Sequence, residues 1–198
     1  MMKFTKAAAV VTSVALLLGG LTGASVYAKG KVAARPAKIE KKTQKVSVKP
    51  EYVSMVIETG KMDHHPGWPK FTNAYWTAKP GTIVLTIRSY DDGSAPVSEE
   101  YAEVRGTVGG VEKVDGKVVR SIKPQDVAHT FTIPALGINI PVPVAPSGGS
   151  VTVQAVLHIT KTGSFSWQCF APCGTGKTGW GGPMATPGYM LGTIHIKA

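Results

Sequence analysis

Both cysteines of the chain, Cys169 and Cys173, lie in a glycine- and proline-rich segment close to its C-terminal end. Two thiolates separated by three residues can face one soft metal ion, such as copper or zinc, from a single turn. The same spacing permits a disulfide, which is the usual pairing of two cysteines in an exported protein. Such a disulfide would close a very short loop and restrict the unfolded chain little. Both interpretations stay open at this point.

Histidine and methionine side chains supply the other candidate ligands. Met184 and Met190 follow the cysteines, and His129 lies in an alternating segment forty residues before the first of them. The pair His64 and His65 lies in a predicted loop, 61–76, that also holds two prolines and two tryptophans. An isolated histidine among apolar residues is more often packed in a core than bound to metal, and a pair beside a proline is typical of an exposed turn.

The elements that would position these residues are short β-strands. Alternating apolar and polar residues predict strands at 52–57, 82–89, 128–134, 150–160, 164–169 and 191–197. Residues 99–123 are polar, with two glycine-containing turn signals, and predict a hairpin or a long insertion. Residues 138–146 are apolar and proline-rich, which predicts a loop or an edge strand. Seven or eight such strands separated by turns indicate an all-β sandwich or barrel.

Three segments together resemble the cupredoxin family. They are DVAHTF (126–131), GSFSWQC (163–169) and MLGTI (190–194), separated by a long strand and a glycine-rich loop. The resemblance implies a Greek-key β-sandwich or barrel that binds copper. His129 matches the first histidine ligand of the family, and Met190 matches the axial methionine better than Met184 does. The C-x3-C spacing is closest to the copper A domain of cytochrome oxidase subunit II, in which Cys169 and Cys173 would bridge two copper ions.

One ligand of that pattern is missing. Four residues after Cys173, where copper A has a histidine, this chain has Lys177, and no histidine lies between Cys173 and Met190. The second imidazole would then come from His64 or His65. Alternatively, copper is held by one imidazole, two thiolates and a thioether, or the two cysteines are oxidised to a disulfide.

The resemblance implies a protein that binds one or two copper ions and carries single electrons. The sequence shows no general base, nucleophile triad or phosphate-binding loop, so we expect a non-enzyme. Its partner would be a redox protein, for example of a respiratory chain. A Cu(I) delivery or storage protein is the first alternative, since the missing histidine weakens the hold on Cu(II). A metal-free surface module with a Cys169–Cys173 disulfide is the second.

The net charge of +10 is concentrated at the N-terminal end of the chain. Residues 1–28 carry +2, residues 29–49 carry +7, and the remaining 149 residues carry about +1. A nearly neutral domain, 50–198, has no basic surface for nucleic acid. Residues 1–28 resemble a signal peptide, with lysines, an apolar core and a small-residue exit. We therefore expect an extracytoplasmic protein, secreted or held at the membrane by an uncleaved N-terminus, whose lysine-rich linker (29–49) contacts the anionic cell envelope.

Overall fold

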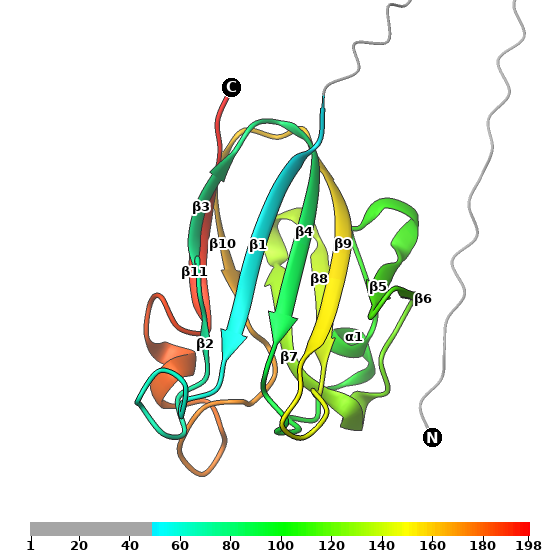
Figure 1. The fold of residues 1–198 in the computed structure, drawn as a ribbon. Coiled ribbons are helices and arrows are strands. Elements are labelled where there is room, and N and C mark those ends of the chain that lie inside the picture. Colours follow the sequence, from blue (N-terminus) through cyan, green and yellow to red (C-terminus); the bar gives the residue numbers. More distant parts are fainter. Residues whose placement is uncertain (1–48) are drawn as a thin grey trace, which may run out of the picture. The chain divides into compact units, whose positions relative to one another are not determined.

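The computed structural model describes residues 49–198, so the predicted signal peptide and all but the last residue of the predicted linker lie outside the described residues. Residues 49–198 form eleven strands and only short helical turns, which confirms the prediction of an all-β protein (Figure 1). No helix in this range is long and apolar enough to cross a membrane. The strands are β1 (Glu51–Glu58), β2 (Lys70–Phe71), β3 (Tyr75–Ala78), β4 (Gly81–Ser89), β5 (Glu112–Val114), β6 (Lys117–Val119), β7 (Val127–Ile133), β8 (Ile138–Pro143), β9 (Val151–Ile159), β10 (Gly163–Gln168) and β11 (Leu191–Ile196).

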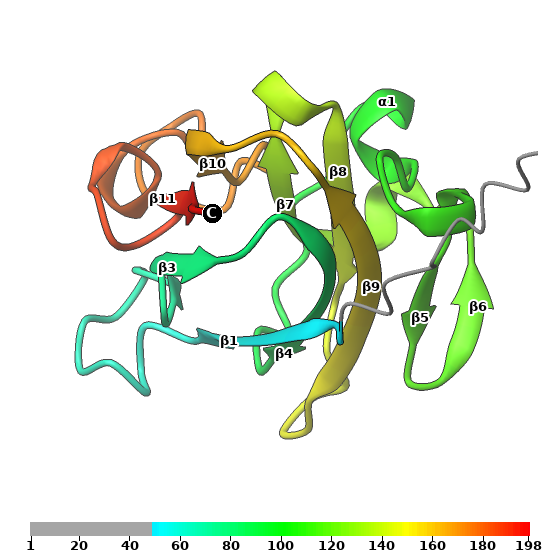
Figure 2. The ribbon, with the colours of Figure 1, turned by 90° about the horizontal axis from the view of Figure 1, so that it is seen from above.

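The strands form two sheets that face each other (Figure 2). One sheet has the order β2-β1-β4-β9-β5-β6, and the other has the order β3-β11-β10-β7-β8. The longest pairing joins β4 and β9, in antiparallel register from Gly81 opposite Ile159 to Ser89 opposite Val151. Both strands bury every second residue, because one face of each lies on the core and the other faces away from it.

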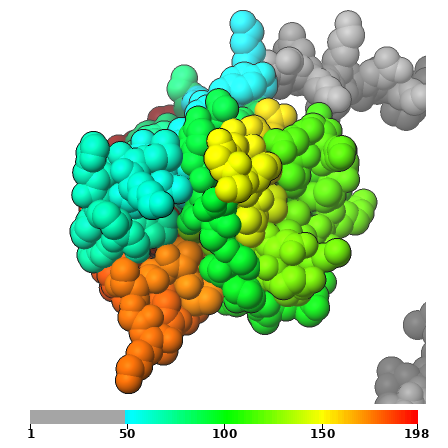
Figure 3. All heavy atoms as spheres, turned by 60° about the horizontal axis from the view of Figure 1, so that its bottom comes forward, coloured from blue at the N-terminus to red at the C-terminus, as the bar shows by residue number. Residues whose placement is uncertain are grey.

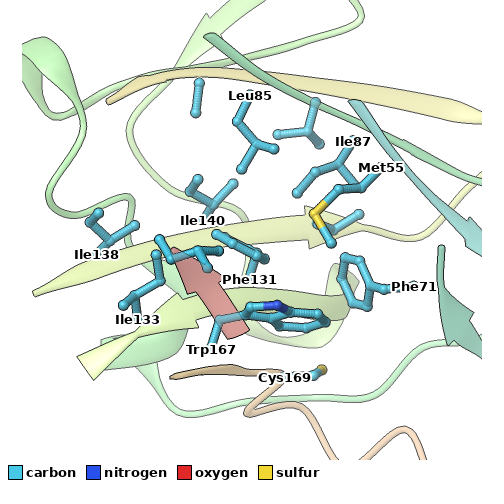
Figure 4. Close-up of a cluster of buried hydrophobic side chains, with 14 of the residues drawn as sticks. Met55, Phe71, Leu85, Ile87, Phe131, Ile133, Ile138, Ile140, Trp167 and Cys169 are labelled. Carbon is cyan, nitrogen blue, oxygen red and sulfur yellow. The ribbon is translucent and has the colours of Figure 1, made fainter. Parts of the chain in front are cut away.

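The core fills the space between the two sheets (Figure 4). Leu85 and Ile87 enter it from the first sheet, and Phe131, Ile140 and Trp167 enter it from the second. All five side chains are at most 1% exposed. Burying one side chain of this size stabilises a fold by about 1.5–3 kcal/mol before entropy is counted. The strand ends next to this core are therefore well-fixed supports for a site.

Residues 138–146 contain β8, one of the two edge strands of the second sheet, which confirms the edge strand predicted there as one alternative. Another segment differs from its prediction. Residues 61–76, predicted as a loop, contain β2 and the first half of β3. The strand β3 forms because it pairs in parallel with β11, with Trp76 opposite Ile194. This partner is more than one hundred residues away, so alternation within the segment itself does not reveal the strand.

Residues 99–123 form a short helix, α1 (Glu99–Ala102), a 3₁₀ turn (Val108–Gly110) and the β5–β6 hairpin, which confirms the hairpin predicted there. The first part of this segment also covers β7 and β8. Asn139 donates two hydrogen bonds to the carbonyls of Tyr101 and Glu103, at 3.0 and 2.7 Å. Its side-chain oxygen accepts a bond from Thr132 at 2.7 Å. This cover explains why all seven residues of β7 are buried. Three further 3₁₀ turns lie at Pro124–Asp126, Pro134–Leu136 and Gly182–Ala185.

Candidate metal centre

Several of the candidate ligands lie at one end of the sandwich, where β10 ends and β7 begins, the lower end in Figure 1. His129 lies near the start of β7, and Cys169 directly follows the end of β10. Because β7 and β10 are antiparallel, with Gln168 opposite Thr132, the residues that follow β10 run back along β7 toward its start. The loop after β4 reaches the same end and carries Asp91.

The structure brings three of the predicted ligands together. A ring nitrogen of His129 and the Sγ atoms of Cys169 and Cys173 all lie within 4.8 Å of one another. The two sulfurs are 3.5 Å apart, and both cysteines are free. His129 and Cys169 are fully buried, whereas Cys173 is partly exposed. One imidazole and two thiols around a single point form a donor set suited to a soft metal ion.

The imidazole of His129 is oriented by a carboxylate. Its Nε2–H donates to Oδ2 of Asp91 at 2.9 Å, and Oδ1 of Asp91 accepts a bond from the backbone N–H of Gly93 at 2.9 Å. The other ring nitrogen, Nδ1, is buried and has no hydrogen-bond partner. A buried polar atom without a partner is costly, and a metal ion would provide one. Metal-binding histidines commonly donate their second N–H to a carboxylate in this way.

The same contacts shift the pKa of each partner. Burial alone would lower the pKa of His129, but the hydrogen bond to Asp91 and the nearby Cys169 sulfur raise it to about 9. For Asp91, burial acts to raise the pKa, and the bond and charge of His129 with the Gly93 N–H bring it below its ordinary value. Without metal, the imidazole therefore carries a proton that binding of a metal ion would displace.

Strand β7 also holds the cysteine loop in place. The backbone N–H of Thr130 donates to Sγ of Cys169 at 3.3 Å, and the Thr130 hydroxyl accepts the N–H of Phe170 at 2.8 Å. Burial raises the pKa of Cys169, but Cys173, His129 and the Thr130 N–H together hold it well below its usual range. The pKa of Cys173 is raised, first by its bond to Cys169 and then by burial. The pair therefore tends to share one proton.

Two methionines lie near the cysteines, but only one contacts a cysteine through sulfur among the described residues. Sγ of Cys173 is 3.3 Å from Sδ of Met184. Met190 is fully buried, and it contacts the loop through its carbonyl, which accepts the N–H of Cys169 at 2.8 Å. The geometry therefore favours Met184 over Met190, the reverse of the order that the resemblance implied.

The remaining histidines lie outside the cluster. His64 is exposed and has a left-handed backbone, with φ of 53°. His65 is exposed and stacks on Trp68, with ring centroids 4.1 Å apart. His158 lies in β9 facing outward, and His195 bonds to Ser164 at 2.8 Å. Neither His64 nor His65 lies in the cluster, and Lys177 is exposed in the glycine-rich loop.

Sequence reasoning missed two residues of the site. Asp91 reads as part of the turn signal Asp91-Asp92-Gly93, and nothing in that pattern links it to a histidine 38 residues later. Thr130 was visible only as a polar residue in an alternating strand. Its contacts with Cys169 and Phe170 depend on how the chain after β10 packs along β7, for which the local sequence carries no signal.

No family model matches the sequence, and no curated protein matches it. Similar solved structures include rusticyanin from Thiobacillus ferrooxidans, with a TM-score of 0.35 and 18% identity over 76% of this chain and 79% of that chain. They also include a blue copper oxidase from Nitrosomonas europaea, with a TM-score of 0.39 and 13% identity over 75% of this chain and 44% of the oxidase. A reduced Cu(I) form of an amicyanin variant has a TM-score of 0.27 and 11% identity over 77% of this chain and 87% of the amicyanin chain. Similarity at this level carries no argument about function, and the all-β fold is established by the two sheets themselves.

Proposed function

We propose that this chain is a copper-binding protein of the cupredoxin type that carries single electrons outside the cytoplasm. His129, Cys169, Cys173 and Met184 are the proposed ligands. The observation that carries the proposal is the buried Nδ1 of His129, which has no hydrogen-bond partner although Nε2 is fixed by Asp91. Thiol, thioether and imidazole donors suit copper, and thiolates and thioethers favour Cu(I).

Copper would supply the one-electron redox couple, and the chain supplies a fixed and largely dry ligand set. Trp167 is 1% exposed and packs against Phe71 and Phe131, with ring centroids 4.9 and 5.0 Å away. Figure 4 shows this aromatic group beside Cys169. Its packing excludes water from the inner side of the centre, and the strands limit ligand movement between oxidation states. Both effects support electron transfer.

Cu(I) delivery or storage is the second candidate. A specific observation favours it: His129 is the only one of the five histidines that joins the cluster, and all five lie in the described part of the chain. One imidazole beside two thiols holds Cu(I) better than Cu(II). In either role we propose that the chain acts without enzymatic turnover, with a redox partner or a copper acceptor as its counterpart.

Copper reconstitution with visible and electron paramagnetic resonance spectra tests the proposal. An electron carrier will give an intense thiolate-to-copper absorption that bleaches on reduction and returns on oxidation. A delivery or storage protein will take up Cu(I) without forming a stable coloured oxidised state. Absence of copper uptake, together with a Cys169–Cys173 disulfide seen by mass spectrometry, would instead favour the metal-free module. Metal analysis of the same sample decides between one copper ion and two.

A further inference from the structure

The two cysteines differ in their access to solvent. Cys169 is 0% exposed, and its sulfur is fixed by the Thr130 N–H. Cys173 is partly exposed, and its sulfur contacts only the sulfurs of Cys169 and Met184 by hydrogen bonds. One thiol is therefore held inside the fold, and the other lies where the fold meets solvent.

A cavity of about 380 Å³ opens onto the more accessible cysteine. Its walls come from the loop after β1, the loop after β4 and the cysteine loop. Its lining includes Cys173 and Gly174 but not Cys169, His129 or either methionine. Figure 3 views this end of the molecule, where the cysteine loop (orange) and the residues following β1 (teal) lie on the same face. The cavity thus reaches the candidate centre on the Cys173 side.

The cavity walls are held by local hydrogen bonds. In the loop after β1, the N–H of His65 donates to the carbonyl of Gly60 at 2.7 Å. In the loop after β4, the Asp91 carboxylate is fixed at one oxygen by His129 and at the other by Gly93. The opening is therefore a feature of the folded domain.

The charge around the cavity favours some incoming donor molecules over others. The lining carries two carboxylates, Asp91 and Asp92, against one ammonium group, that of Lys61. The Asp91 charge is balanced by the protonated His129 imidazole 2.9 Å away, and the Asp92 charge by Lys61. The excess negative charge therefore comes from the cysteine pair behind the cavity, because the pKa of Cys169 is lowered. It disfavours anions by about 1 kcal/mol at a partly exposed position. An uncharged or cationic donor can therefore enter the cavity, whereas the negative charge repels an anionic donor.

We propose that this cavity is the port through which copper is exchanged, that Cys173 is the ligand released first, and that the port admits soft donors without negative charge. The exchange step rests on the proposed copper centre. The incoming thiol binds Cu(I) through its sulfur and gives up its proton, while Cys173 leaves the metal and takes up a proton. Cys169 and His129 stay bound until the second donor arrives, and the oxidation state of copper does not change.

Alkylation of the metal-free protein tests the port without any metal. Iodoacetamide should modify Cys173 at least about tenfold faster than Cys169, as read by peptide mass spectrometry, because only Cys173 lies on the cavity. Thiolate character alone would favour Cys169, whose pKa is the lowered one. Equal or faster labelling of Cys169 would therefore overturn the proposal.

Charge-changing variants at the mouth sharpen the test. Iodoacetate, the anionic counterpart, should react more slowly than iodoacetamide relative to a free thiol standard. The measured quantity is the rate with iodoacetate divided by the rate with iodoacetamide. D92N should raise this rate ratio about threefold to fivefold, and K61Q should lower it. D126N, an exposed change outside the lining, should leave the rate ratio unchanged. Identical ratios in all four proteins would contradict the selectivity of the port.

Copper exchange from the loaded protein completes the test. Transfer of Cu(I) to uncharged 2-mercaptoethanol should exceed transfer to anionic 2-mercaptoethanesulfonate by about fivefold, and D92N should narrow the gap. A protein that takes up no copper would refute the proposed function, whereas the alkylation order would still decide whether the port exists. A loaded protein that exchanges both thiols equally would refute only the port's charge selectivity.

Discussion

His129 and Glu112 are buried ionisable side chains in two regions of the molecule, and their surroundings differ. At the metal-centre end, His129 is 0% exposed and is bonded to Asp91. In the β5–β6 hairpin, Glu112 is 1% exposed, and neither of its carboxylate oxygens has a hydrogen-bond partner. The partner raises the pKa of His129 to about 9, so the group keeps its charge. Burial without a partner raises the pKa of Glu112 to about 8, so the group stays neutral at pH 7.

The difference separates a built site from an isolated buried acid. Asp91, Thr130 and Gly93 all hold groups of the metal-centre end in fixed positions. Glu112 instead lines a small cavity of about 90 Å³ together with valines such as Val111 and Val156. A buried polar group with arranged partners indicates a functional site, whereas one without partners reduces stability.

The largest expected effect is at His129. H129A should lower copper affinity by at least about 100-fold and abolish any thiolate-to-copper absorption, because it removes the only imidazole in the cluster. E112Q serves as the matched control, since it alters a buried ionisable group far from the cluster and should leave copper binding unchanged. Competition titration with a copper chelator measures both. Wild-type affinity in H129A would remove His129 from the ligand set and end the contrast between the two regions.

The next effect is on stability at the hairpin. Because the pKa of Glu112 rises from 4.5 to about 8 on folding, the native state holds a proton that the unfolded state releases between these values. The contribution of Glu112 to stability is therefore full below pH 4.5, falls as pH rises and levels off above about 8. The loss by pH 7 is on the order of 3 kcal/mol. E112Q should remove this part of the pH dependence in urea unfolding, and E99Q, an exposed control, should keep it. If the free energy of unfolding of E112Q depends on pH as in wild type, Glu112 has a hydrogen-bond partner that keeps its pKa near the ordinary value.

The contrast also shows what the sequence could and could not predict. The strands β4 and β9 follow from local alternation, and the cluster of His129 with the cysteines follows from segment patterns that end at strand termini. The Asp91 bond depends on how a loop folds back on another sheet, which no local pattern encodes. Glu112 sits next to exposed Lys113 in a polar segment. Only the register of β5 decides which of the two points inward.

A smaller effect is expected at Asp91 itself. D91A should lower copper affinity by about 10–100-fold, because it frees the His129 ring from its orienting bond. D91N keeps an acceptor oxygen for Nε2–H and should lose less. D126N, an exposed change outside the cavity lining, is the control and should leave equilibrium affinity unchanged. If D91A binds copper as tightly as wild type, the Asp91 carboxylate does not contribute to copper affinity. The hydrogen bond of His129 would then not distinguish it functionally from Glu112.

The smallest expected effect distinguishes the two methionines at the metal-centre end. Sδ of Met184 is 3.3 Å from Sγ of Cys173, whereas Met190 contacts the cysteine loop through its carbonyl. M184L and M190L remove one thioether each from a buried position, with similar side-chain volume and a similar cost in stability. M184L should lower Cu(I) affinity by about tenfold and shift the copper spectrum, because a soft ligand is lost, and M190L should do neither. The opposite result would return the ligand role to Met190, as the family resemblance implies, and would mean that metal binding rearranges the loop between Cys173 and β11.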